Sequence, residues 1–134
     1  MAKRQIYAIE DGYCTTTDAV TQTAMCTYDV SIGAPGNTAL NNCVIFINGN
    51  SAGYDTTSTA GCGERVASVF KVVAGVLSQV GATVHVTAMI DDVPSTPNTG
   101  LSIAGNIITY YATGSVGETI EWLGRIELHI YQPA

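Results

Sequence analysis

Apolar and polar side chains alternate near the end of the chain. The apolar positions are Ile120, Trp122, Ile126, Leu128 and Ile130, and the polar side chains between them include Glu121, Arg125, Glu127 and His129. Successive side chains of a strand point to opposite faces, so this two-residue period is typical of a strand with one buried face. Gly124 interrupts the apolar positions, which indicates a bulge or a close backbone approach.

Shorter segments of the same kind occur along the whole chain. We expect strands at residues 6–9, 25–32, 43–47, 82–90, 101–103 and 107–111. Residues 43–47 are apolar throughout, as in a strand covered on both sides. Turns are predicted at Asp11-Gly12, at residues 33–37, at Asn48-Gly49-Asn50, in a tight hairpin at 104–106 and at 114–117, and loops at 51–63 and 91–100.

The segment from Glu64 to Gly81 allows two interpretations. Val66, Val69, Phe70, Val73 and Leu77 have helical spacing. Against a helix stand the run of β-branched valines, the interior Gly75 and the lack of a capping box. We favour strand, turn and strand here.

These segments predict an all-β chain. Seven to eight short strands with turns about every ten residues indicate an antiparallel β-sandwich with a jelly-roll-like arrangement. The length of 134 residues suits a single domain over 1–134. Lys3 and Arg4 fall in a candidate flexible N-terminal arm, residues 1–5, which could touch an acidic partner.

Composition points to a surface that other molecules can cover. Charged residues make up 12% of the chain, against about 25% in typical globular domains. Thr, Ser, Asn and Gly take their place, and a surface poor in Lys and Glu is dehydrated at little cost. We therefore expect assembly with neighbouring molecules.

The charge balance argues against two classes of partner. The formal net charge is −6 with five Lys and Arg in all, so we expect no nucleic-acid partner. The start has no secretory signal and no stretch is apolar enough to span a bilayer, so we expect no membrane partner and synthesis in a cytoplasm.

Cys14, Cys26, Cys43 and Cys62 leave several alternatives open. Two disulfides would suit the even count, whereas synthesis in a reducing compartment favours buried free thiols. A zinc site is disfavoured, because no pair has CxxC spacing and His85 and His129 lie far downstream.

The sequence shows no known catalytic motif. There is no nucleophile elbow, metalloprotease motif, phosphate-binding loop or dinucleotide fingerprint. Asp91-Asp92 is an adjacent pair of carboxylates, which we interpret as a solvated loop start, with a calcium contact as the alternative. His85 and His129 fall on polar strand faces without a partner nucleophile. We therefore predict no enzyme activity, no cofactor and no metal.

Large side chains divide into expected core and interface positions. The expected core side chains are Phe46, Phe70, Trp122, Ile126 and Leu128. The interface candidates are Lys3, Arg4, Tyr110, Tyr111, His129 and Tyr131, with one of the adjacent pair Tyr110 and Tyr111 facing outward.

The C-terminal half resembles small β-rich structural proteins of tailed bacteriophages. The similarity rests on Phe70-Lys71 through Gly75-Val76-Leu77 and Val80-Gly81, on Ala112-Thr113-Gly114, and on Gly117, Thr119-Ile120 and Trp122 to Leu128. It covers about half the chain, and residues 1–64 show no such pattern.

The resemblance implies a structural virion protein. The role it suggests first is a capsid decoration (cement) protein that forms a homotrimer, binds the major capsid protein on the capsid exterior and stabilises the shell. The alternative is a tail-fibre or receptor- or carbohydrate-binding module that uses loops 51–63 and 91–100.

Overall fold

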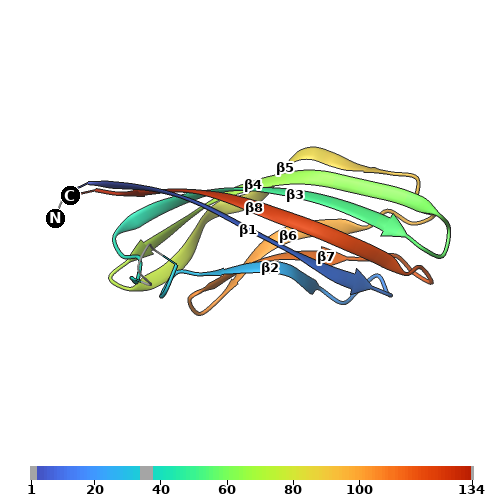
Figure 1. The fold of residues 1–134 in the computed structure, drawn as a ribbon, viewed down its shortest axis with the longest axis horizontal. Helices are drawn as coiled ribbons and strands as arrows, with labels where there is room; N and C mark the ends of the chain where they lie inside the picture. The colour runs from blue at the N-terminus through green and yellow to red at the C-terminus, as the bar shows by residue number, and fades with distance from the viewer. Residues whose placement is uncertain (1–2, 34–37, 134) are drawn as a thin grey trace.

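Eight strands form two antiparallel sheets. The computed structural model describes residues 3–33 and 38–133. One sheet has the strand order β1, β8, β3, β4, β5, and the other has the order β2, β7, β6 (Figure 1). The strands are β1 (Arg4–Thr16), β2 (Thr23–Asp29), β3 (Cys43–Asp55), β4 (Ala60–Val73), β5 (Val76–Asp91), β6 (Asn98–Ala104), β7 (Ile107–Thr113) and β8 (Ile120–Gln132). The predicted all-β, antiparallel sandwich is confirmed.

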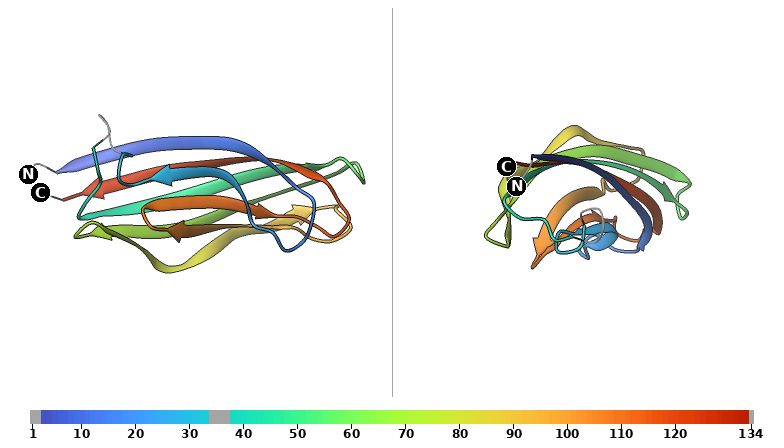
Figure 2. Two further views of the ribbon diagram at one scale, coloured as in Figure 1. Left: turned by 90° about the horizontal axis from the view of Figure 1, so that it is seen from below. Right: turned by 60° about the vertical axis from the view of Figure 1, so that its left-hand side comes forward.

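The larger sheet extends the full length of the molecule. β1 and β8 pair without a break from Arg4 opposite Gln132 to Thr16 opposite Ile120, which places both chain ends at one end of the sandwich (Figure 1). The larger sheet curves over the smaller one, whose short strands cover only its inner side (Figure 2). Its outer side carries no second layer within the described residues.

The core lies between the two sheets. Phe70, Trp122, Ile126 and Leu128 are all buried, and the indole N–H of Trp122 donates to Thr16 Oγ1 at 2.9 Å. This bond satisfies the polar group that a buried Trp carries inward.

Phe46 does not belong to this core. It is 43% exposed, because Ile45 and Ile47 take the inward phase of β3 while Val44 and Phe46 point outward. The expectation of a strand covered on both sides is therefore wrong.

The strand interpretation of residues 65–81 is confirmed. β4 and β5 pair through Val73 opposite Val76, with Ala74 and Gly75 as the turn residues. Both have positive φ, at 50° and 78°. Two positive φ angles are typical of a type I′ hairpin turn, whose twist matches that of the strands.

Three predicted breaks are instead parts of continuous strands. β1 passes through Asp11-Gly12 and β3 passes through Asn48-Gly49-Asn50. Residues 51–63 are not a loop, because β3 and β4 continue to Asp55 and Ala60 around a turn at 56–59.

Close approach explains the glycines inside these strands. A Cβ at Gly49 would lie 3.0 Å from the Tyr110 ring and from Val66 Cγ2, and one at Gly12 would overlap the carbonyl of Met25. Gly124, opposite Gly12, is close to Met25 too, with Sδ 2.7 Å from an added Cβ. The close approach predicted at Gly124 is confirmed.

The other predicted turns have mixed outcomes. The 104–106 hairpin joins β6 to β7, with φ of 57° at Gly105, and residues 114–119 connect β7 to β8. Of the 91–100 loop, Asp91 belongs to β5 and residues 98–100 belong to β6. Residues 34–37 of the predicted 33–37 turn lie outside the described residues.

The N-terminal arm is only partly described. Arg4 and Gln5 belong to β1, and both Arg4 Nε and Nη2 donate to Gln132 Oε1, at 3.2 and 2.6 Å. Lys3 is exposed, and residues 1–2 lie outside the described part. In residues 3–33 and 38–133 we find no helix with the length and apolar character needed to cross a bilayer.

Candidate interaction surface

The outer face of the five-stranded sheet carries most of the exposed large apolar side chains. We call this surface, made by the outward residues of β1, β8, β3, β4 and β5, the outer face. Its apolar members include Tyr7, Ile9, Tyr13, Val44, Phe46, Tyr54, Val80, Val84, Ile90, Leu123 and Tyr131. Large exposed apolar areas on soluble proteins mark sites of association.

Strand register gathers these side chains into rows across the sheet. Tyr7 lies opposite His129, His129 opposite Phe46, Phe46 opposite Val69, and Val69 opposite Val80. This row, which we call the Phe46 row, crosses all five strands. The rings of Tyr7 and His129 meet edge to face with centroids 4.9 Å apart.

A groove accompanies the Phe46 row near the chain ends. Its volume is about 600 Å³, and it is lined by Gln5, Ile6, Tyr7, Val44, Phe46, His129, Ile130 and Tyr131. Two expected interface residues, His129 and Tyr131, thus lie together with Phe46, which the sequence had placed in the core. Exposed aromatic rings in a concavity are the usual anchors of protein interfaces.

A second apolar row lies towards the other end of the sheet. Tyr13 pairs with Leu123, Leu123 with Ala52, Ala52 with Gly63, and Gly63 with Ile90. Tyr13 is 80% exposed and Ile90 is 72% exposed. The outer face therefore has apolar positions at both ends.

A polar row separates the two apolar rows. It consists of Asp11, Arg125, Asn50, Arg65 and Thr87. Arg125 Nη2 lies 3.1 Å from Asp11 Oδ2, and both side chains are about half exposed. Exposed ion pairs like this one contribute little to the free energy of folding. We expect the polar row to set the orientation of a partner that docks on the outer face.

The adjacent Tyr110 and Tyr111 do not belong to the outer face. Tyr110 is fully buried and Tyr111 is half-buried in β7, on the smaller sheet. The interface role expected for Tyr110 is therefore wrong, because its ring fills the space above Gly49.

The outer face could not be identified from the sequence alone, because residues 43–47 of β3 are apolar in both phases. That double apolar character was the available signal, and it was interpreted as cover on both sides. The cover is present on one side only within the described residues. Tyr7, Tyr13, Val80 and Val84 are outer-face residues that the sequence analysis did not name as interface candidates.

One cluster of titratable side chains occurs inside the sandwich. Glu64 Oε1 accepts hydrogen bonds from the backbone N–H of Thr99 at 2.8 Å and from its hydroxyl at 2.6 Å. His85 Nδ1 lies 3.0 Å from Glu64 Oε2, and the side chain of Glu64 is 2% exposed against 43% for His85. The Tyr110 hydroxyl lies 3.4 Å from Thr99 Oγ1. Glu64 was not among the expected site residues, although its position in phase with Val66 and Phe70 is the sequence signal for a buried acid.

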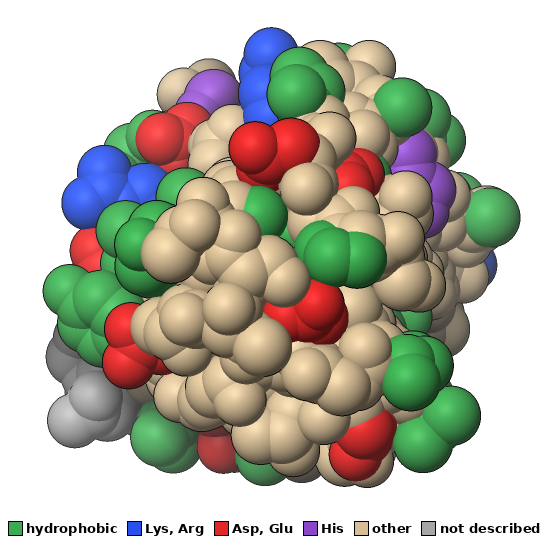
Figure 3. Space-filling view, turned by 90° about the vertical axis from the view of Figure 1, so that its right-hand side faces the viewer, with side chains coloured by type: hydrophobic (Ala, Val, Ile, Leu, Met, Phe, Trp, Pro, Cys, Tyr) green, Lys and Arg blue, Asp and Glu red, His purple; other side chains and the backbone are tan. Residues whose placement is uncertain are grey.

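The far end of the sandwich is mostly uncharged and polar. Figure 3 shows this end, where scattered acidic side chains interrupt uncharged polar groups and backbone. Asp55 is buried there, and its Oδ1 accepts from the N–H groups of Thr57 and Ser58. Its Oδ2 has no hydrogen-bond partner in the part of the chain that the structure describes. The Ser58 hydroxyl in turn donates to the carboxylate of Glu118, lying 2.8 Å from Oε1.

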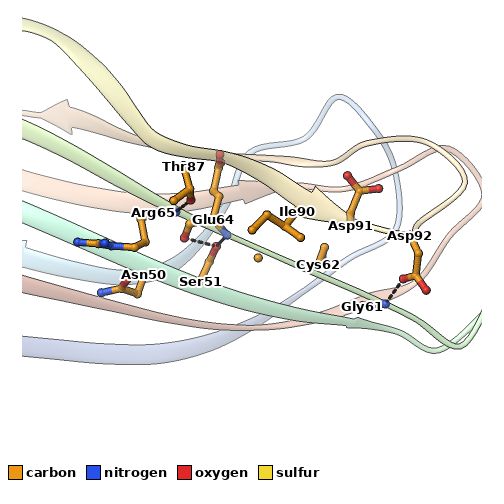
Figure 4. A pocket seen from close by; sticks show the side chains of 11 residues that line it. Asn50, Ser51, Gly61, Cys62, Glu64, Arg65, Thr87, Ile90, Asp91 and Asp92 are labelled. Atoms are coloured by element: carbon orange, nitrogen blue, oxygen red, sulfur yellow. Dashed lines mark hydrogen bonds between the residues drawn. The ribbon is translucent and has the colours of Figure 1, made fainter.

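A shallow cavity borders Glu64 between β4 and β5 (Figure 4). Its volume is about 650 Å³, and its lining includes Cys62, Arg65, Thr87, Asp91 and Asp92. Asp92 Oδ1 accepts from the N–H of Gly61 at 2.7 Å, which ties this loop start to β4. Among the described residues no three His, Cys, Asp or Glu side chains are placed to hold a metal ion.

All four cysteines are free. Burial raises the pKa of Cys26 to about 11. Burial also raises the pKa of Cys62 to about 11, helped by the negative charge of Asp91, Asp55 and Asp92. Burial raises the pKa of Cys14 and of Cys43. The thiols therefore act as small apolar groups, and the structure contains neither of the expected alternatives, a disulfide or a zinc site, in its described part.

Comparison with known proteins yields a shared fold. No family model and no curated protein sequence matches the chain. Among solved structures, the tailspike protein of Acinetobacter baumannii phage AM24 matches with a TM-score of 0.54 and 12% identity, over 94% of this chain and 26% of that protein. The chain thus corresponds in fold to about a quarter of that protein's length.

Proposed function

We propose that the chain is a structural protein of a tailed-phage virion that works by covering its outer face with neighbouring virion proteins. The observation that carries the proposal is the outer face, with apolar rows at both ends of an open sheet. The fold shared with part of a phage tailspike, and the resemblance of residues 65–128 to phage structural proteins, support the virion as the place of work.

The magnitude of burial fits this role. Full burial of a Val, Leu, Ile or Phe side chain contributes about 1.5–3 kcal/mol. The outer face offers seven such side chains, between 43% and 72% exposed, and four tyrosines besides. Their combined burial is comparable to the cost of association, about 4–15 kcal/mol. The role needs no catalytic step.

Two positions in the virion are candidates. The fold neighbour is by its name a tail component, which favours a tail-associated module. A capsid decoration protein bound to the major capsid protein is the second candidate, favoured by the charge-poor exterior. The homotrimer implied by the resemblance stays a prediction.

The experiment is immunogold labelling, with an antibody against the chain, of virions purified from cells that produce it. We expect gold on the tail; gold over the head supports decoration, and particles without any label contradict both. A Phe46→Lys variant should lose its place on the particle, because a charge in the Phe46 row must be dehydrated for docking. Val20→Lys is the matched control, since Val20 is 84% exposed and lies on the 17–22 loop, away from the outer face.

A further inference from the structure

β5 is an open edge of the larger sheet. It pairs with β4 on one side, and within the described residues no strand pairs with its other side. Its outward N–H and C=O groups therefore form a template for another extended chain. β5 is also the longest strand, with 16 residues.

β5 lacks the charges that guard natural sheet edges. Proteins block edge pairing with charged side chains, Pro, bulges or a covering element. β1, the opposite edge, carries Arg4, Glu10 and Asp11. β5 contains no Lys, Arg, Glu or Pro, and its acidic residue, Asp91, stands at its last position.

The side chains of β5 are exposed as well as its backbone. Leu77 is its buried residue, while Val76, Val80, Val84, Val86 and Ile90 are between 47% and 72% exposed. The alternation predicted for residues 82–90 is present, but its apolar members face solvent. A strand of this composition is expected to be covered on at least one side.

Bulges divide β5 without closing its edge. The register with β4 shifts three times, between Val80 and Val84, between His85 and Thr87, and between Thr87 and Ile90. Gly81, with φ of 73°, lies in the first of these shifts. The extended segments on either side keep their free edge.

We propose that β5 pairs antiparallel with β5 of a second copy of this chain. Two identical strands can always pair antiparallel around a two-fold axis, which makes a closed, isologous contact. The distribution of charge indicates which surface two copies can share with least repulsion. Each chain carries a net charge of −6, so two copies approach best along a strip that has no acidic side chain until Asp91. Pairing with β1 of another copy would instead place the apolar strand against Glu10 and Asp11.

This contact gives an even number of copies and so differs from the trimer implied by the resemblance. It does not rest on the proposed virion role, since a virion protein could use either symmetry. Failure of the pairing would leave the labelling result unaffected, and absence from virions would leave the pairing unaffected.

The test is the mass of the full chain by sedimentation equilibrium. Wild type should have twice the mass of one 14.0 kDa chain. Val84→Lys should return it to one chain, because a lysine on an edge strand is one of the devices that block pairing with another strand. The matched control is Ile9→Lys, which should keep the mass of two chains. Ile9 lies in the same cross-strand row as Val84, through Glu127, Asn48 and Ala67, but on the guarded edge.

Hydrogen exchange identifies the surface used. Amides of β5 should exchange more slowly in wild type than in Val84→Lys, because only edge pairing gives them new acceptors. A monomeric wild type, a trimeric mass, a Val84→Lys variant that remains a dimer, or a dimer whose β5 amides stay unprotected would each overturn the proposal. Far-ultraviolet circular dichroism of both variants checks that the fold is kept, since both side chains are exposed.

Discussion

At the scale of single residues, Glu64 shows how the sandwich holds a carboxylate in its interior. Burying such a group is costly unless hydrogen bonds replace water. Thr99 supplies two of these bonds to one oxygen and His85 faces the other. Thr99 belongs to β6 of the smaller sheet, and His85 belongs to β5, the neighbour of β4 in the larger sheet. The Glu64 carboxylate on β4 therefore links the two sheets to each other and β4 to β5.

Replacing Thr99 by Val should therefore destabilise the fold. The hydroxyl bond to Glu64 is lost while the shape of the side chain is kept, which costs about 1.5–3 kcal/mol for a bond to a charged group. Urea unfolding measures the change in the free energy of unfolding. Thr27→Val, at an exposed position of β2, should change it little, and equal stability of the two variants would refute the role of the hydroxyl.

The thiols give a prediction with a defined pH range. A thiol whose pKa rises from about 9 to about 11 on folding, as in Cys26 and Cys62, keeps its proton better in the folded state. The stability linked to these groups is therefore complete below about pH 9 and is lost as the pH rises towards 11. At about pH 8 we expect slow labelling of the folded chain by a thiol reagent and fast labelling of all four cysteines in urea. Fast labelling of the folded chain would contradict the burial of the thiols.

At the scale of elements, the alternation of apolar and polar residues predicted most of the strands. Glycines inside strands were the positions where the prediction placed a turn and the structure has none. β8 and the β4–β5 hairpin were predictable because polar residues occupy one phase, or because valines and Gly75 disfavour a helix. Gly12 and Gly49 were interpreted as turn residues, whereas they are small because Met25 and Tyr110 approach them. Single-sequence patterns cannot distinguish these two uses of glycine, since the approaching residue lies far away in the chain.

The β4–β5 turn offers a stabilising substitution. Ala74 has a φ of 50°, where an L-residue other than Asn or Asp is strained by about 1–2 kcal/mol. Ala74→Asn should raise the free energy of unfolding by about 0.5–1 kcal/mol, because Asn tolerates this conformation in a type I′ turn. Thermal unfolding is the measurement, and Ala52→Asn, at an exposed position of β3 without positive φ, should give no gain. A destabilised Ala74→Asn variant would contradict the turn type.

At the scale of the whole molecule, two sheets of unequal size decide what is exposed. Three short strands cover only the inner side of five longer ones, so the apolar outward phases of β3 and β5 face solvent. The sequence predicted a covered exterior in general terms, from its low charge. It could not identify the face, because the phase of each strand depends on which side the second sheet takes.

Hydroxyl-radical footprinting of the chain, free and assembled in the virion, tests the covered outer face most directly. In the free chain we expect strong oxidation of Tyr7 and Tyr13, which are 55% and 80% exposed, and none of the buried Tyr110. In the virion Tyr7 and Tyr13 should become protected while Val20 stays reactive. Equal oxidation of Tyr7 and Tyr13 in the two states would contradict the account.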